Sequence, residues 1–380
     1  MSTEQKRILV FSDWFLPGYR AGGPIRSLVN LVNALPYQFL IVTSIKDHHH
    51  EVPYKNITPN EWTQYAAHVK VMYLSDDKIN NTTFRDLMSA SQYDKIYFNS
   101  LFSPRFTIAP LLVARKMKLQ HQVVLAPRGM LKSGALSVKA WKKKIFLRYA
   151  KLTSLYKNII WHATNSDEVD EIRSLFRVAQ DIRLAPNLPS LPKGKPTKPL
   201  KRSGDMKLVC IARISPEKGI LEAVQYLKSA QLDGYVQCDF YGTQQNAEYL
   251  KQCETLAQSI PKVHIAFKGE IEPHNIHDLL SGYHFFYMPT WGENFGHAIA
   301  EALNAATPVL ISSNTPWQDL PSKHAGWNLP LNEKQFAQQL NALLQMEQDE
   351  YRMWSNGAYE LGYSTAHDVE LVEASYRLFG

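Results

Sequence analysis

The sequence predicts an α/β protein made of two doubly wound domains, and three observations carry this prediction. With 380 residues, the chain is longer than one ordinary hydrophobic core supports, so two domains of roughly 150–200 residues are expected. Apolar, β-branched segments of strand length alternate with amphipathic segments of helix length, a pattern typical of parallel sheets covered on both faces. A proline-rich, basic stretch at 185–205 interrupts this alternation and predicts a connector between the domains.

The first half of the chain contains short apolar runs followed by helical patterns. The runs expected to form strands are residues 7–12, 39–43, 69–74, 95–99 and 123–126. Residues 25–35 are expected to form a helix because their apolar side chains recur at helical spacing. Further helices are expected near 83–91, 106–118, 137–157 and 166–177. Together these elements predict an N-terminal domain over residues 1–184.

The same alternation resumes after the connector and predicts a second domain over residues 206–360. Its expected strands are residues 207–212, 236–241, 263–267, 285–288 and 309–312. Its expected helices, together with the last helix of the chain, are residues 218–230, 246–258, 274–281, 333–346, 348–361 and 367–379. Doubly wound domains bind ligands at the carboxyl ends of their strands, so the loops after these strands are the candidate site.

Composition and charge narrow the class of protein. The net charge is +7, and Lys and Arg outnumber Asp and Glu in residues 1–180 whereas the reverse holds in 206–380. No run of about 18 apolar residues occurs, and residues 1–6 lack the plan of a signal peptide. The three cysteines have no metal-ligand spacing, which predicts buried, reduced thiols in a cytoplasmic protein. They are Cys210, Cys238 and Cys253.

Two glutamates, Glu293 and Glu301, are separated by seven residues near a predicted strand end. The small-residue loop 290–296 is expected to lead into a short helix that begins at Glu293 and carries Glu301. Free backbone amides would then point toward an anionic or hydroxyl-rich ligand. These amides belong to Asn294, Phe295 and Gly296. Two carboxylates beside such donors suit the hydroxyls of a sugar or ribose; the alternative is a solvated helix with two ordinary glutamates.

Two cations follow the first predicted strand of the second domain. Arg213 leaves the strand end and Lys218 lies at the start of the next helix. A guanidinium fork and a movable ammonium five residues apart can clamp a diphosphate. The alternative is a capped helix with two surface cations.

A glycine pair, Gly22 and Gly23, joins the first strand of the chain to its helix. Such a pair permits positive φ and a close approach of the backbone to a ligand, although tight loop closure explains it equally well. In both predicted domains, the first strand is not followed by G-x-G-x-x-G, which disfavours a dinucleotide-dependent oxidoreductase.

In combination and order, the glycine loop, the connector, R-x4-K and E-x7-E resemble the retaining, nucleotide-sugar-dependent glycosyltransferases of family 4. These enzymes have the GT-B fold, in which two Rossmann-like domains face each other across a cleft. The resemblance covers nearly the whole chain, including residues 361–380, a final helix that in this family typically crosses back to the first domain. It implies that Arg213 and Lys218 neutralise the leaving diphosphate, that Glu293 binds a hydroxyl of the transferred sugar, and that Glu301 holds the ribose.

The resemblance also implies the remaining donor contacts and the reaction. The Asn294–Gly296 amides would assist Glu293, the backbone at Glu270 and Ile271 would hold the nucleobase, and Gly22–Gly23 would approach from the opposite domain. A hexosyl group would be transferred with retention, without a metal or any cofactor beyond the nucleotide-sugar co-substrate. The departing phosphate would help deprotonate the acceptor, so Glu293 is expected to position the sugar rather than attack it.

The sequence departs from the family at one place in the first domain. Many relatives carry a histidine there after a mid-sheet strand, whereas this chain has Arg128 and Gly129. Arg128 would contact phosphate or an anionic sugar; the alternative is a salt bridge that holds the loop. His162 and Asp13 are further candidates that more often serve structure. His48–His50 resembles a metal cluster, but a solvated loop is the expected reading.

Residues 139–157 form a basic segment without any acid, interleaved with aromatic and aliphatic side chains. A basic amphipathic helix suits an anionic membrane surface, and the alternative is a helix packed on its own sheet with a basic outer face. Since enzymes of the resembled family often act on lipid-linked or cell-envelope glycans, the expected acceptor is a glycan or lipid-linked glycan of polysaccharide or O-antigen-type biosynthesis. Peripheral contact with the cytoplasmic face of the membrane is expected.

Three other functions remain as alternatives. A sugar-nucleotide epimerase or hydrolase of the same fold would keep the donor site without transferring sugar to an acceptor. A catalytically silent partner subunit is disfavoured by the intact Arg213, Lys218, Glu293 and Glu301. Nucleic-acid binding ranks last because the basic first half contains no recognisable nucleic-acid-reading element.

Overall fold

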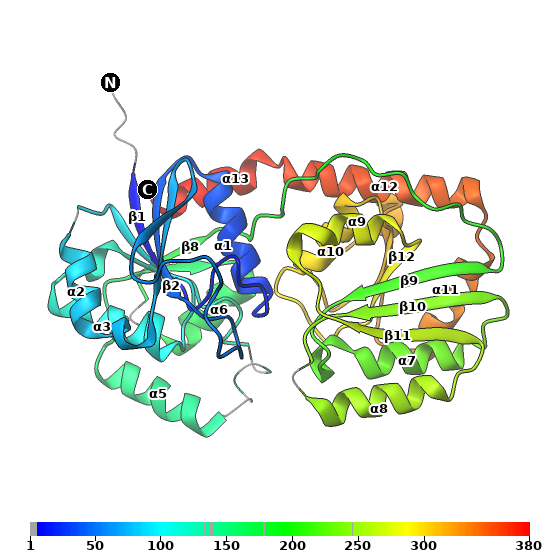
Figure 1. Cartoon of the computed structure of the whole chain (residues 1–380), viewed down its shortest axis with the longest axis horizontal. Helices are drawn as coiled ribbons and strands as arrows, with labels where there is room; N and C mark the ends of the chain where they lie inside the picture. The colour runs from blue at the N-terminus through cyan, green and yellow to red at the C-terminus, as the bar shows by residue number, and fades with distance from the viewer. Residues whose placement is uncertain are drawn as a thin grey trace. The chain divides into compact units, whose positions relative to one another are not determined.

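The chain is organised as two compact units (Figure 1). The computed structural model describes residues 6–90, 92–132, 134, 136, 140–177, 179–244 and 246–380. The first unit comprises Met1–Leu188 together with Val369–Gly380, and the second comprises Pro189–Asp368. Each unit has its own sheet and core, which confirms the prediction of two α/β domains.

The first unit contains an eight-stranded sheet in the order β3-β4-β2-β1-β5-β6-β7-β8. Its strands are β1 (Arg7–Phe11), β2 (Gln38–Ser44), β3 (Trp62–Ala66), β4 (Val69–Leu74), β5 (Lys95–Phe98), β6 (Val123–Leu125), β7 (Ile160–Ala163) and β8 (Asp181–Leu184). All neighbours pair in parallel except β3, which runs antiparallel to β4 at the sheet edge. Its α-helices are α1 (Gly23–Ala34), α2 (Asn81–Ser89), α3 (Ala109–Lys116), α5 (Ala140–Leu152), α6 (Ser166–Leu175) and α13 (Val369–Leu378), and Pro104–Ile108 (η2) leads into α3.

Side chains alternate across the first sheet and build a core on each face. On β1, Leu9 and Phe11 pack with Phe98 into one cluster. Ile8 and Val10 point the other way and share a cluster with Phe379 near the C-terminus. This alternation follows from the two-residue period of a strand, and it explains why the strands read as continuous apolar runs.

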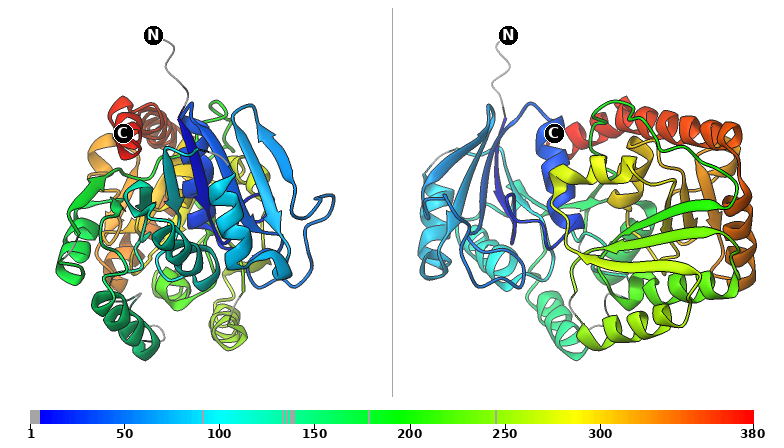
Figure 2. Two further views of the ribbon diagram at one scale, coloured as in Figure 1. Left: turned by 90° about the vertical axis from the view of Figure 1, so that its left-hand side faces the viewer. Right: turned by 45° about the vertical axis from the view of Figure 1, so that its right-hand side comes forward.

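The second unit contains a six-stranded, wholly parallel sheet in the order β11-β10-β9-β12-β13-β14. Its strands are β9 (Asp205–Ile211), β10 (Tyr235–Tyr241), β11 (Val263–Gly269), β12 (Phe285–Met288), β13 (Val309–Ser312) and β14 (Gly326–Leu329). Its α-helices are α7 (Ile220–Ser229), α8 (Ala247–Gln258), α9 (Ile276–Ser281), α10 (His297–Asn304), α11 (Glu333–Gln345) and α12 (Gln348–Ala366). Figure 2 shows helices on both faces of this sheet, with α7 and α8 on one and α9 and α10 on the other.

Four strands were not predicted from the sequence: β3, β7, β8 and β14. β3 is an edge strand with mostly exposed, polar side chains, so it lacks an apolar run. The other three are only four residues long and contain polar residues, such as His162 in β7 and Arg183 in β8. Their place in the sheets is set by pairing with neighbouring strands rather than by their own pattern.

The predicted connector divides between the units: Ala185 and Leu188 are buried in a core of the first unit, and from Pro189 on the segment is bound to the second. Lys198 Nζ donates to Leu280 O and Thr307 Oγ1, both at 2.8 Å. Lys201, which is fully buried, donates to three carbonyls at the end of α11 and in the connector itself. Burial lowers the pKa of Lys198 to about 7 and that of Lys201 to about 8.

The last helix of the chain, α13, belongs to the first unit. Leu378 and Phe379 are buried in one of that unit's cores. Arg183 on β8 donates to the carbonyls of Arg377, Leu378 and Gly380, each at 3.0 Å. The chain therefore passes between the units twice.

Candidate functional site

The candidate site begins where the strand order of the second sheet reverses. β10 and β11 follow β9 on one side, whereas β12 and β13 lie on its other side. In doubly wound sheets, ligands bind at such a switch point, outside the carboxyl ends of the strands. The loops that follow the neighbouring strands β9 and β12 carry Lys218 and Glu293, respectively.

These two loops are held together by close backbone contact. Gly219 has φ 66°, and a Cβ at this position would lie 1.9 Å from Pro289 O. Thr290 Oγ1 and the Trp291 amide both donate to Glu217 O, at 3.0 and 3.1 Å. Only glycine permits both the positive φ and the close approach, so residue 219 fixes the distance between the loops.

The central feature of the site is an ion pair between Lys218 and Glu293. Lys218 Nζ lies 2.5 Å from Glu293 Oε1, and the two side chains are 17% and 13% exposed. Partial burial strengthens such a pair relative to one in open solvent. Their spacing in the sequence predicts that the two residues bind different parts of a ligand, but it does not predict that they bind each other.

Arg213 lies at the rim of the same loop. Its guanidinium pairs with Glu217 at 2.9 Å, and both side chains are largely exposed. Exposed pairs of this kind contribute little to stability, so a stronger anion can replace Glu217 at low cost.

The position of Glu293 relative to helix α10 corrects the sequence analysis. α10 begins at His297, four residues after Glu293, because Gly296 has φ 81° and interrupts the helix. Asn294, Phe295 and Gly296 therefore precede the helix, and their amides are not those of its first turn. Glu293 lies in the loop, where its amide donates to Asn314 O at 3.2 Å.

The other predicted positions of the second unit are Glu301, Glu270 and Ile271. Glu301 is half-buried within α10. Glu270 and Ile271 follow β11, which ends at Gly269, and Gly269 O accepts from the Gly242 amide at 2.8 Å. Glu270 and Ile271 therefore lie at the carboxyl edge of the sheet, whereas Glu301 lies within the helix.

Arg128 in the first unit is the centre of a polar network. Its Nε donates to Asn99 Oδ1 at 2.9 Å and its Nη2 to Tyr97 Oη at 2.7 Å, while its Nη1 donates to Asn187 Oδ1. These three acceptors are uncharged, so hydrogen bonds to neutral groups stand where the alternative interpretation of Arg128 placed a salt bridge. Arg128 itself has φ 56°, at the loop after β6.

His162 extends this network into the core. Its Nε2 lies 2.8 Å from Ala185 O and its Nδ1 2.9 Å from Tyr97 Oη. Because a carbonyl only accepts, Nε2 carries the proton and Nδ1 accepts from the tyrosine. Burial, reinforced by the charge of Arg128, lowers the pKa of His162 to about 3, so it is neutral and structural.

The glycine loop of the first unit is shaped by an aspartate that the sequence analysis missed. Asp47 Oδ2 accepts from the amides of Tyr19 and Arg20, at 3.0 and 3.3 Å. Gly22 has φ 68° and caps α1, and a Cβ at Gly22 or Gly23 would meet no atom within 4 Å. No local spacing in the sequence signals the role of Asp47.

Asp13 and His48–His50 are the other candidate residues of the first unit. Asp13 accepts from Ser103 Oγ at 2.6 Å, and burial raises its pKa. Within the described residues no group of three metal-ligating side chains is found, including at His48–His50.

Cys210, Cys238 and Cys253 are free and buried, as predicted. No helix in the described part of the chain is long and apolar enough to cross a membrane.

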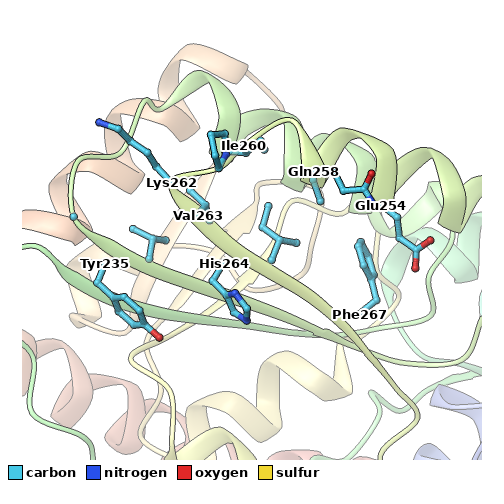
Figure 3. Close-up of a pocket in the computed structure, with 13 residues that line it drawn as sticks. Tyr235, Glu254, Gln258, Ile260, Lys262, Val263, His264 and Phe267 are labelled. Atoms are coloured by element: carbon cyan, nitrogen blue, oxygen red, sulfur yellow. The ribbon is translucent and has the colours of Figure 1, made fainter.

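A separate pocket of about 700 Å³ lies along the edge strand β11 (Figure 3). Its lining includes Tyr235, Glu254, His264 and Phe267 and none of the candidate site residues. The concave volume and the charged switch-point loops are therefore different places on the second unit.

Comparisons with known proteins identify the fold. Residues 194–361 match the family model described as glycosyl transferases group 1. Sucrose-phosphate synthase from Thermosynechococcus elongatus superimposes with a TM-score of 0.71 at 17% identity, covering 99% of this chain and 98% of that one. HepE of Anabaena in complex with UDP and glucose gives 0.71 at 15% identity, with 97% and 98% covered. WaaG, a glycosyltransferase involved in lipopolysaccharide biosynthesis, gives 0.64 at 12% identity, with 98% of both chains covered.

The class defined by this fold is GT-B, two Rossmann-like units with parallel sheets. Within that class, the second unit matches the group 1 glycosyltransferases. A search of curated proteins found no significant match.

Proposed function

We propose that the protein is a retaining, metal-independent glycosyltransferase of the hexosyltransferase type that uses a nucleotide-diphosphate-sugar donor. The observation that carries the proposal is the Lys218–Glu293 pair at the switch point between β9 and β12. It offers a cation and a carboxylate side by side, as a sugar diphosphate requires. The family match of the second unit and the UDP and glucose in the HepE complex support the same class of donor.

The two cations of the loop would bind the donor's diphosphate. Lys218 exchanges Glu293 for a phosphate oxygen, and Arg213 exchanges the exposed Glu217. Glu293, released from Lys218, accepts a hydrogen bond from a sugar hydroxyl. Neutralising the leaving group in this way lowers the barrier to its departure.

The remaining donor contacts follow the order of the strands. Glu301 holds the ribose hydroxyls, and the backbone at Glu270 and Ile271 after β11 holds the base. Asn294–Gly296 supply backbone groups to the sugar from the loop before α10. Gly22–Gly23 and Arg128 are the proposed contributions of the first unit, which also receives a glycan or lipid-linked glycan acceptor of cell-envelope polysaccharide or O-antigen-type biosynthesis.

The proposed reaction retains the configuration at the anomeric carbon. The bond from that carbon to the phosphate oxygen breaks while the acceptor oxygen bonds to the same face. The acceptor's proton passes to the departing phosphate oxygen, so no protein base is required. Glu293 positions the sugar and forms no covalent intermediate.

A ligand panel tests the donor site directly. UDP-, GDP- and ADP-sugars at about a hundredfold excess over Kd should raise the melting temperature of the protein by roughly 5 °C or more for the correct donor. Lys218→Ala should abolish the shift. The matched control Lys262→Ala removes an exposed second-unit lysine that pairs with Asp233 and should leave it intact.

Product analysis separates transfer from its alternatives. Transfer of the sugar to an added acceptor, with the anomeric configuration of the donor retained, supports the proposal. Free sugar or a donor epimer as the only product points to a hydrolase or epimerase. No response to any nucleotide sugar would indicate a catalytically silent partner subunit instead.

A further inference from the structure

Helix α5 presents an apolar stripe outward from the first unit. Its four exposed apolar side chains are Trp141 (65%), Ile145 (58%), Tyr149 (46%) and Leu152 (87%). At about 100° per residue, these four positions fall within an arc of roughly 80°. Figures 1 and 2 show α5 at the periphery of the first unit. Residues 137–139 of the predicted helix lie outside the described residues.

The opposite side of α5 already has its packing partners. Leu147 and Ala150 are buried in a core of the first unit. Phe146 makes an edge-to-face contact with Phe102, with ring centroids 5.8 Å apart. The exposed stripe is therefore a second apolar face, which packing within the unit does not require.

Cations accompany the stripe, and α5 contains no acidic residue. Exposed Lys144, Arg148 and Lys151 follow one flank, and exposed Lys142 lies on the other. Lys142 Nζ lies 5.4 Å from the centroid of the Trp141 ring. The outer face thus combines aromatic and aliphatic side chains with positive charge, rather than the basic outer face expected of an ordinary surface helix.

We propose that the outer face of α5 docks on an anionic lipid membrane. Helices that lie in the membrane interface bury an apolar face at the boundary of headgroups and acyl chains and hold cations at the phosphates. Trp141 and Tyr149 suit this boundary because their rings are apolar and their polar atoms remain hydrated. All charged side chains of α5 are positive. This favours an anionic lipid surface over a protein interface, where charges of both signs are usual. This inference goes beyond the sugar-transfer reaction and does not depend on it.

Vesicle flotation tests the apolar part of the proposal. The full chain should float with vesicles of phosphatidylcholine and phosphatidylserine. The Ile145→Ser, Leu152→Ser double variant should partition on the order of tenfold less. Val52→Ser, which changes a similarly exposed apolar residue of the same unit, should bind as the wild type does.

The charged part requires its own variants. Lys144→Gln, Arg148→Gln, Lys151→Gln should lower partitioning by at least about tenfold, as should omission of phosphatidylserine. A control variant replaces three exposed lysines of the first unit outside α5 with glutamine and should bind normally. These are Lys55, Lys70 and Lys116.

Three outcomes would overturn the proposal. The first is absence of flotation, and the second is equal flotation of the wild type with and without phosphatidylserine. The third is a concentration-dependent dimer in light scattering that the Ile145→Ser, Leu152→Ser change dissociates, without vesicle binding, which would assign the stripe to a second copy of the chain. None of these measurements requires a sugar nucleotide, so donor binding succeeds or fails separately.

Discussion

At the scale of single residues, the Lys218–Glu293 contact combines two sequence signals into one device. The R-x4-K motif predicts that Lys218 binds a ligand, and the E-x7-E motif predicts the same of Glu293. Each prediction rests on residues close together in the sequence. The 2.5 Å contact between them depends on strands β9 and β12 being neighbours, although 75 residues separate the two side chains. Spacing along the chain carries no information about that pairing.

Lys218→Ala should lower kcat/KM for sugar transfer by on the order of a hundredfold or more, because the leaving diphosphate loses the largely buried cation that neutralises it. The largely buried Glu293 then loses its ion pair with Lys218, which should cost roughly 1–3 kcal/mol in the free energy of unfolding. Steady-state kinetics and urea unfolding measure the two effects. Lys218→Arg, which keeps the charge, should recover part of the rate; equal rates in wild type and Lys218→Ala would remove Lys218 from the site.

His162 predicts how stability depends on pH. Its pKa is lowered to about 3 in the folded chain, whereas an unfolded histidine takes up a proton below about pH 6.5. Protons therefore favour the unfolded state as the pH falls from about 6.5 toward 3, and stability declines by up to about 1.4 kcal/mol per pH unit. Urea unfolding at pH 7 and pH 5 should show this loss in the wild type.

A His162→Gln variant supplies the control for that pH dependence. The loss between pH 7 and pH 5 should shrink by about 2 kcal/mol in this variant, because the group that titrates only when unfolded is gone. An unchanged pH dependence would mean that other groups account for it.

At the scale of elements, strands with buried apolar runs and long helices were predictable, whereas β3, β7, β8, β14 and the loop conformations were not. β12 and β13 were predicted at their observed bounds, because their buried, apolar runs specify them. The start of α10 was placed four residues too early, since the small residues of its loop are compatible with a helix. Gly296 with φ 81° decides the matter, and a glycine's φ cannot be read from its identity alone.

Gly219→Ala should lower the free energy of unfolding by at least about 2 kcal/mol, because its φ of 66° is strained for alanine and the new Cβ would overlap Pro289 O. Activity should fall with it, since Lys218 and Glu293 would be forced apart. Thermal unfolding and a transfer assay on the same preparation test both effects. Wild-type stability in this variant would contradict the tight loop contact.

Gly23→Ala is expected to behave in the opposite way. The position lies in open space and its φ is not positive, so α1 should keep or slightly gain stability. Any loss of sugar transfer in this variant would then report the approach of a ligand to the glycine loop. Unchanged kinetics would assign Gly23 to loop closure alone.

At the scale of the whole molecule, length and alternation predicted two α/β units, and the family resemblance implied that the last helix crosses back to the first unit. Val369–Gly380 follows the second unit in sequence but contributes Leu378 and Phe379 to a core of the first. The connector's two buried lysines likewise bind the second unit. Basic, proline-rich composition predicted a connector there, but composition does not reveal the buried carbonyl partners of these lysines.

Phe379→Ala should therefore destabilise the first unit by about 3–5 kcal/mol, although the residue lies at the far end of the chain. Hydrogen exchange should accelerate in β1 and β2, whose Ile8 and Phe39 share its core, while β9 and β10 keep their protection. A mainly second-unit response would contradict the assignment of α13. Leu191→Ala, at an exposed position, serves as the control.

The Lys218–Glu293 pair also implies a selectivity that the ligand-free protein would possess under the proposed function. Each charge already has an internal counter-ion, so inorganic phosphate or pyrophosphate would have to displace Glu293 from Lys218 and would bring no hydroxyl to that carboxylate in exchange. A sugar nucleotide instead brings an anion for the lysine and hydroxyls for the glutamate, satisfying both at once. Glu293 would thus compete with any anion for Lys218. Inorganic phosphate and pyrophosphate would bind weakly for this reason, whereas the complete donor would bind well.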